Sequence, residues 1–127
     1  MARRMVVTLL LLLPAISAFG KARNDTYPAS CSQVWDAVKA TLANPTDYKI
    51  MVSDDSEMTA TYLVTGDQRA RVDSVALTPQ DAGCQMKVQA ADAGYMVDDE
   101  GAFRKRVSRS LAKLQAAKPS APAKSGQ

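Results

Sequence analysis

The sequence predicts a two-layer α+β domain in which a four-stranded antiparallel meander is covered on one face by an N-terminal and a C-terminal helix. Three observations favour this fold. Apolar side chains recur at helical spacing over residues 31–42 and again over residues 98–115. Between them, residues 48–90 hold four short apolar or alternating runs separated by polar turns. The globular domain is therefore expected to span residues 30–116.

The two ends of the chain are expected to lie outside this domain. Residues 1–20 begin with two arginines near the N-terminus, continue with the apolar run MVVTLLLLL and end in a proline and the small residues of AISAFG, the pattern of a secretory signal. The run is too short to span a bilayer comfortably. We expect cleavage after Ala18 or Gly20, export to the periplasm or the extracellular space, and no transmembrane segment in the mature protein. Residues 21–29 then form an N-terminal extension, and residues 117–127, rich in Pro, Ala, Lys and Ser, form a disordered tail.

The first helix is predicted to begin at Cys31. Ser30 and Gln33 fit a capping box, in which each side chain bonds the backbone N–H of the other residue. The apolar side chains that follow share one face of the helix: Cys31, Trp35, Val38 and Leu42. The sequence NPTD ends the helix, because a proline disfavours helical geometry in the residue before it.

Four strands are predicted from YKIMVS, MTATYLVT, RARVDSVAL and CQMKVQA. The intervening segments DDSE, GD and TPQDAG are rich in residues that favour tight turns. In the second and fourth strands one alternating set of side chains is apolar and is expected to face the helices. The other set is polar and is either a solvated surface or a partner-binding face of the sheet: Thr59, Thr61, Gln85, Lys87 and Gln89.

The two cysteines of the chain, Cys31 and Cys84, both fall on the core-facing side of their elements. An even number of cysteines in an exported protein predicts a disulfide. A bridge closing so long a loop would contribute about 4 kcal/mol in the chain-entropy model. Two alternatives stay open. A reactive thiol would lack a histidine as its base, because the chain has none, and lipidation of Cys31 would place the lipid far from the apolar run.

The second helix is predicted over DDEGAFRKRVSRSLAKLQ, residues 98–115. Three acids open it and bases follow, which is the order of charges that a helix dipole favours, and Glu100 and Arg104 are spaced to pair. Its apolar stripe consists of Phe103, Val107, Leu111 and Leu114. A basic face carries Lys105, Arg106, Arg109 and Lys113. These four side chains form either a solvated face that complements the dipole or a docking site for an anionic surface.

Composition excludes several functions. The overall charge of +3 carries no evidence for nucleic-acid binding, because residues 24–116 contain ten basic and thirteen acidic residues, and we expect no nucleic-acid partner. Without histidine, Ser-His-Asp and Cys-His catalysis and zinc sites built on imidazole are excluded. Neither a phosphate-binding glycine loop nor the spacing of a calcium loop is present. We therefore predict no catalytic residues, no metal and no cofactor.

The order of motifs resembles a type of small, uncharacterised bacterial envelope domain, often carried by lipoproteins, that has an α-β4-α layout. The resemblance covers residues 31–114 and rests on SQVWDAVKATL, the turn at Asp54-Asp55 and DDEGAFRKRV. It implies the same α+β fold, and it implies no activity because the type has none assigned. This chain differs from the type in having no cysteine next to the apolar run.

These observations predict an exported, non-catalytic binding or protein-interaction domain that acts on an envelope protein or polymer. Two other functions stay open. One is a hydrolase of envelope glycans that uses paired carboxylates. The other is docking to an anionic surface through the basic face of the C-terminal helix.

Overall fold

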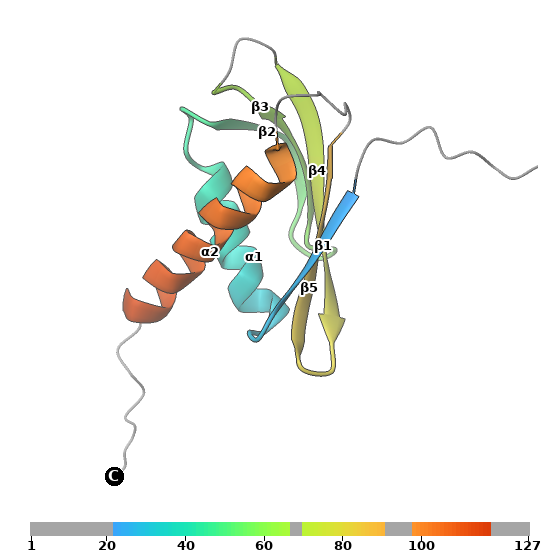
Figure 1. The fold of residues 1–127 in the computed structure, drawn as a ribbon, viewed down its shortest axis with the longest axis vertical. Coiled ribbons are helices and arrows are strands. Elements are labelled where there is room, and N and C mark those ends of the chain that lie inside the picture. The colour runs from blue at the N-terminus through green and yellow to red at the C-terminus, as the bar shows by residue number, and fades with distance from the viewer. Residues whose placement is uncertain (1–21, 67–69, 91–97, 118–127) are drawn as a thin grey trace, which may run out of the picture.

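The computed structural model describes residues 22–66, 70–90 and 98–117. Along the chain the elements are β1 (Ala22–Tyr27), α1 (Cys31–Leu42), β2 (Tyr48–Asp54), β3 (Thr59–Val64), β4 (Arg71–Gln80), β5 (Gly83–Ala90) and α2 (Asp99–Ala117). The strands form one antiparallel sheet in the order β1-β5-β4-β3-β2, and both helices lie on one of its faces (Figure 1). The two-layer α+β fold and the meander from β2 to β5 are therefore confirmed.

The predicted number of strands is wrong, because the sheet has five strands and not four. The additional strand, β1, lies within residues 21–29, which the sequence analysis treated as an extension. It pairs with β5 along its whole length, from Ala22 opposite Gln89 to Tyr27 opposite Cys84. Five of its six residues are polar or small, so it has no apolar alternation from which a strand could be predicted.

Parts of three predictions fall outside the described residues. These are the signal segment at residues 1–20, Asp67 of the turn GD together with Arg69 at the start of the following strand, and the tail from residue 118 onward. Ala117, where the tail was predicted to begin, is the last residue of α2. Within the described ranges, no helix is both long and apolar enough to cross a membrane.

The start of α1 follows the predicted capping box. The Gln33 N–H donates to the Ser30 hydroxyl at 3.3 Å, and the Ser30 N–H donates to the Gln33 side chain at 3.2 Å. The face predicted to be apolar is buried over its whole length. Its first residue, Cys31, forms a disulfide with Cys84 of β5, so the predicted bridge is confirmed and joins the helical layer to the sheet.

An aromatic cluster holds α2 against the other half of the sheet. Phe103 of α2 stacks on Tyr62 of β3, with 5.1 Å between the ring centroids, and Tyr48 of β2 meets both rings edge-on. Tyr62 and Phe103 are fully buried. Aromatic pairs in these geometries stabilise by about 0.5–1.5 kcal/mol beyond the apolar area that they bury. The predicted stripe of α2 is buried up to Leu111, whereas Leu114 is 36% exposed.

The three acids at the start of α2 have different roles. Asp98 is the cap, because its carboxylate accepts from the Gly101 N–H at 3.0 Å. Asp99 is buried and accepts two hydrogen bonds from the Arg71 guanidinium of β4, at 2.7 and 2.8 Å. Glu100 is also buried. The order of charges predicted a helix-dipole role for all three, and the structure adds a buried ion pair between the helix and the sheet.

Reduction of the disulfide is expected to lower the free energy of unfolding by about 4 kcal/mol, because the bridge closes a loop between residues 53 positions apart. Denaturant unfolding of the oxidised and the reduced protein measures the difference. Equal stabilities in the two states would contradict it.

Asp99→Ala is expected to lower the free energy of unfolding by about 3–5 kcal/mol, because it removes one partner of a buried ion pair. Asp98→Ala is the matched control, and its cost is expected to be about 1 kcal/mol, the usual contribution of a helix cap. Thermal or denaturant unfolding of both variants gives the comparison. Equal losses would show that the buried ion pair stabilises the protein no more than the helix cap does.

Candidate functional site

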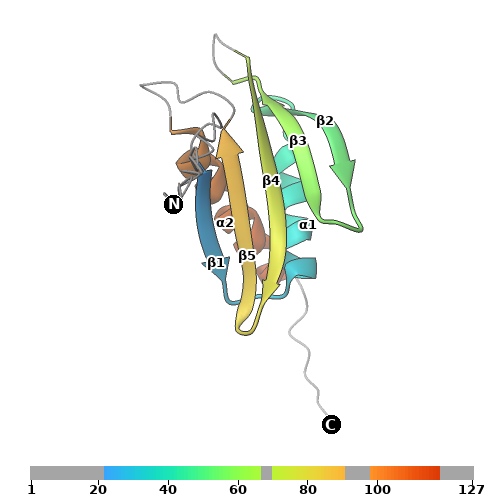
Figure 2. The same cartoon turned by 90° about the vertical axis from the view of Figure 1, so that its right-hand side faces the viewer.

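The candidate partner-binding residues of the sheet all lie on the face turned away from the helices, as predicted. Figure 2 shows this face uncovered by any described element. Thr59, Ala76 and Lys87 form one row across three strands, and Thr61, Ser74 and Gln89 form the next. Lys87 is exposed, and the others are half-buried against their neighbours. These two rows are mostly polar, whereas the nearby pair Leu63 and Val72 on the same face is apolar, and Val72 is 38% exposed.

The structure divides the predicted basic face of α2 into two parts. Three of the bases border a groove of about 290 Å³ between α2 and the end of α1, whereas Lys105 is exposed and is not among the residues that line this groove. We call this feature the helix groove. One wall, from α1 and the loop to β2, consists of Ala40, Thr41, Asn44 and Asp47, and the other, from α2, consists of Arg106, Arg109, Ser110 and Lys113.

Two hydroxyl groups join the walls of the helix groove. Thr41 donates to the Ala37 carbonyl oxygen at 2.8 Å, as threonines within helices often do. Its oxygen also lies 2.9 Å from the Ser110 hydroxyl of α2. Since the Thr41 proton is used within α1, Ser110 is the donor of this second bond. The contact fixes the separation of the helices at the bottom of the groove.

Arg106 is held in place from the other side. Its guanidinium donates to the Tyr48 hydroxyl at 2.8 Å and lies 3.5 Å from the Asp47 carboxylate. The hydrogen bond to Tyr48 raises the pKa of Arg106, and burial raises the pKa of Tyr48, so the pair stays a cation and a neutral phenol at all physiological pH values. Asp47 also accepts from Asn44 at 2.9 Å. Contacts across the groove therefore hold Arg106 and Asp47 in place without a ligand.

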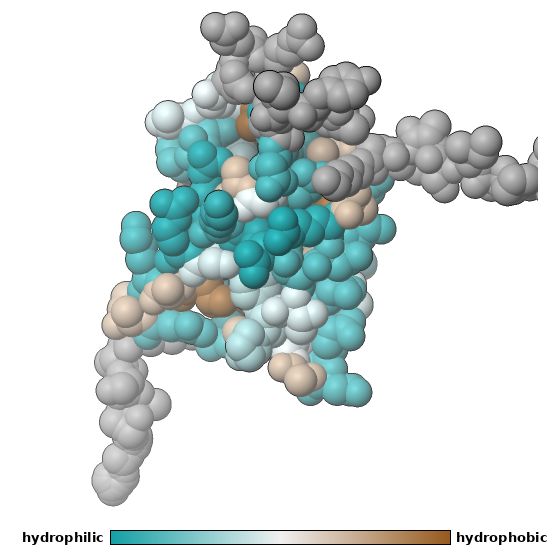
Figure 3. Space-filling view, in the orientation of Figure 1, coloured by the Kyte–Doolittle hydropathy of each residue, from teal (hydrophilic) through white to brown (hydrophobic). Residues whose placement is uncertain are grey.

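The remaining two bases give the helix groove its net positive charge. Arg109 and Lys113 are exposed, and neither forms a salt bridge within the part of the chain that the structure describes. Asp47, the one carboxylate among the lining residues, offsets the positive charge of Arg106. Figure 3 shows that hydrophilic residues cover most of the helical side of the molecule. Chemically, the groove offers two uncompensated cations to an anionic group.

The predicted turn at Asp54 and Asp55 has two separate functions in the fold. Asp54 accepts from the Ser56 hydroxyl and from two backbone N–H groups, which lowers its pKa. Asp55 accepts from the Trp35 indole N–H at 2.8 Å, and this bond, with Lys39 at 3.5 Å, lowers the pKa of Asp55. The hydrogen bonds that stabilise the turn thus account for Asp54 without a ligand. Over the described ranges, no group of three Cys, Asp or Glu side chains is arranged to hold a metal ion.

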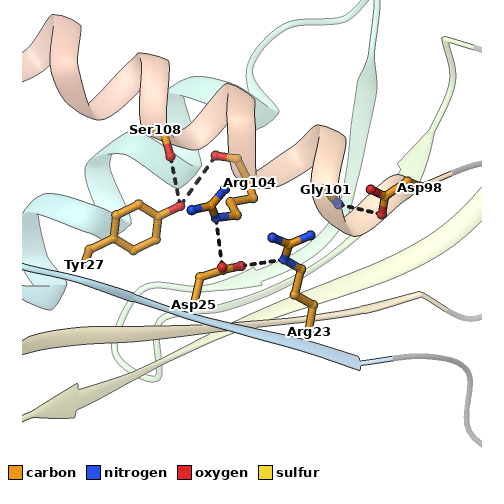
Figure 4. Close-up of polar contacts among 7 residues, drawn as sticks. All are labelled: Arg23, Asp25, Tyr27, Asp98, Gly101, Arg104 and Ser108. Carbon is orange, nitrogen blue, oxygen red and sulfur yellow. Dashed lines mark hydrogen bonds and ion pairs between the residues drawn. The ribbon is translucent and has the colours of Figure 1, made fainter.

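Polar contacts between β1 and α2 were not found from the sequence. The Asp25 carboxylate lies between two guanidinium groups, 3.2 Å from Arg23 and 2.8 Å from Arg104 (Figure 4). The Tyr27 hydroxyl lies 3.3 Å from Ser108 on the same helix. Arg104 thus reaches β1 rather than the predicted partner Glu100. The alternation of Arg23, Asp25 and Tyr27 was the available signal, but charged residues on an inner face do not indicate a strand.

Comparisons with known proteins bear on the fold alone. No protein-family model matches the sequence, and no curated protein matches it significantly. Among solved structures, protein NE0264 from Nitrosomonas europaea has a TM-score of 0.51 at 9% identity, covering 77% of this chain and 97% of that one. Two others are less similar in fold. Ara h 8.0201 has a TM-score of 0.47 at 16% identity, and the match covers 72% of this chain and 97% of that one. Protein CV1439 from Chromobacterium violaceum has a TM-score of 0.41 at 13% identity, and the match covers 80% of this chain and 99% of that one.

The contact between Trp35 and Asp55 predicts how the fluorescence of the single tryptophan depends on pH. Because the folded-state pKa of Asp55 is lowered, the midpoint is expected below the ordinary value of 3.8. The stabilising contribution of the carboxylate is present above that ordinary value and is lost as the pH falls through the lowered one. A fluorescence titration from about pH 6 to about pH 2 measures it, with circular dichroism to identify unfolding.

Two variants separate the effect of Asp55 from general acid unfolding. Asp55→Asn is expected to remove the fluorescence transition, whereas Asp54→Asn, at a carboxylate that does not contact the indole, should retain it. If the fluorescence transition survives in Asp55→Asn, a group other than Asp55 causes it.

Proposed function

We propose that this protein is an exported, non-catalytic binding domain that holds an anionic ligand in the helix groove. The observation that carries the proposal is the convergence of Arg106, Arg109 and Lys113 on one groove whose only lining carboxylate is already paired. Three bases that are merely solvated would gain most by pointing apart. Here two cations that form no salt bridge within the described part of the chain share a concave surface, which favours an oxyanion such as a phosphate or carboxylate group.

Pre-organisation of the groove supports binding rather than turnover. Tyr48 and Asp47 fix Arg106, and the contact between Thr41 and Ser110 fixes the distance between the helices. A ligand would therefore have to order only Arg109 and Lys113, which keeps the entropic cost of binding low. By contrast, hydrolysis by paired carboxylates needs two acids across the scissile bond. Asp47 is a single carboxylate, and Arg106 neutralises it, so the groove does not favour the hydrolase.

Export is the expected setting for this function. The N-terminal signal pattern predicts it, and the disulfide between Cys31 and Cys84 is of the kind that persists in oxidising compartments. In that setting the ligand would be an envelope component or an extracellular molecule. The outer face of the sheet, with Lys87 in one of its polar rows, is a second candidate surface, favoured by the lack of a described element over it.

Binding to inorganic phosphate tests the proposal most directly. We expect saturable changes of amide chemical shifts at Asn44, Asp47 and Arg109, and weaker binding at high salt because the cations are exposed. Arg109→Gln combined with Lys113→Gln should weaken the affinity about tenfold or more, since it removes both uncompensated charges.

Two control variants identify the surface that binds. Lys105→Gln removes a base from the same helix outside the groove, and Lys87→Gln removes one from the sheet face; both should retain most of the phosphate affinity. Phosphatidylglycerol vesicles form the second arm. If Lys105→Gln weakens vesicle binding as much as the groove variant does, the binding site is the whole basic face of α2 and not the groove. If only Lys87→Gln loses binding, the site is on the sheet.

A further inference from the structure

The two edge strands of the sheet, β1 and β2, carry side chains of different character. At the β1 edge, Arg23 and Asp25 point to the inner face, because they pair in register with Val88 and Met86 of β5. Inward-pointing charges are a common device that prevents a sheet edge from pairing with another strand. At the β2 edge the middle of the strand carries Ile50, Met51 and Val52 instead, which are 42, 53 and 65% exposed.

A β-bulge in β2 decides which side chains share a face. Lys49 and Ile50 are opposite Leu63 and Tyr62, but Val52 is opposite Thr61, so Met51 is an extra residue. In a regular strand Lys49 and Asp54, five positions apart, would lie on opposite faces. The bulge places both on the outer face, because their partners on β3, Leu63 and Thr59, are both on that face.

We propose that β2 pairs antiparallel with β2 of a second copy of this chain, joining the two sheets across a two-fold axis between Met51 and Val52. In this register Lys49 of each copy lies opposite Asp54 of the other, and Ile50 lies opposite Ser53. A two-fold axis requires opposite residues to lie on the same face of their own strands. The bulge satisfies this condition for both pairs, and the strand without it would not.

Charge and exposed apolar area both favour a second copy of this chain as the partner of the β2 edge. Lys49 and Asp54 carry opposite charges at the two ends of the strand, so the strand is complementary to itself in the antiparallel direction. Lys49 forms no salt bridge among the described residues, and pairing would supply one. The three exposed apolar side chains lie between the charges, so pairing would also remove apolar surface from water.

Charge reversal tests the proposed register. We expect the purified protein to show a concentration-dependent monomer–dimer equilibrium in sedimentation, with a Kd that increases with salt. Lys49→Asp and Asp54→Lys should each weaken the dimer about tenfold or more, because each places like charges opposite each other. The double variant should restore the dimer, since the pair is then reversed at both ends.

Two further variants control for the fold and for general hydrophobicity. Thermal unfolding of each variant is needed because Asp54 also orders the turn to β3. Val52→Lys should abolish the dimer, whereas Leu114→Lys, at an exposed apolar residue of α2, should leave it unchanged. Zero-length carbodiimide coupling of a mixture of isotopically light and heavy protein should join Lys49 of one copy to Asp54 of another.

Either of two results would overturn the proposal. One is a monomer at every concentration, which would leave β2 as an edge for a foreign strand or for none. The other is a dimer that Val52→Lys does not change or that the double charge reversal does not restore, which would place the interface elsewhere. Both outcomes are independent of phosphate binding, because the helix groove and the β2 edge share none of the residues varied in the two experiments.

Discussion

The buried ion pair between Arg71 and Asp99 decides where α2 meets the sheet, and much of the molecule depends on that position. The two side chains are 9 and 6% exposed, so their attraction is only weakly screened, and moving α2 away from β4 would separate the buried Asp99 carboxylate from the guanidinium that pairs with it. From this point the next turn of α2 brings Phe103 onto Tyr62. Arg104 then reaches Asp25, and Arg106 reaches Tyr48.

The position of α2 in turn creates the helix groove. Since Arg106 is drawn toward Tyr48 and Asp47, the bases that follow at helical spacing face the end of α1. The disulfide at Cys31 holds the opposite end of α1 to β5. Both helices are thus tied to the sheet at one end each, and the contact between Thr41 and Ser110 joins them where they pass. A groove between elements held in this way is pre-organised, which lowers the entropic cost of any binding there.

The sheet contributes two surfaces of different character. Its outer face carries rows of mostly polar side chains across β3, β4 and β5, next to the apolar pair Leu63 and Val72. Its two edges are unequal, because charges close the β1 edge while the β2 edge is bulged and apolar. The helix groove, the outer face of β3 to β5 and the β2 edge are formed by different residues, so a ligand, a partner and a second copy would contact different side chains.

The sequence by itself determined what depends on neighbouring residues: the capping box of α1, the alternation of β3 and β5, the apolar stripe of α2 and the cysteine pair. It did not determine β1, because a polar edge strand is stabilised by its pairing with β5 and by Asp25 and Tyr27 reaching α2. Nor could it separate Asp98 from Asp99, or Lys105 from Arg106. Adjacent residues of a helix differ by about a quarter of a turn, and which of them faces a buried arginine or a groove is decided only when the helix packs.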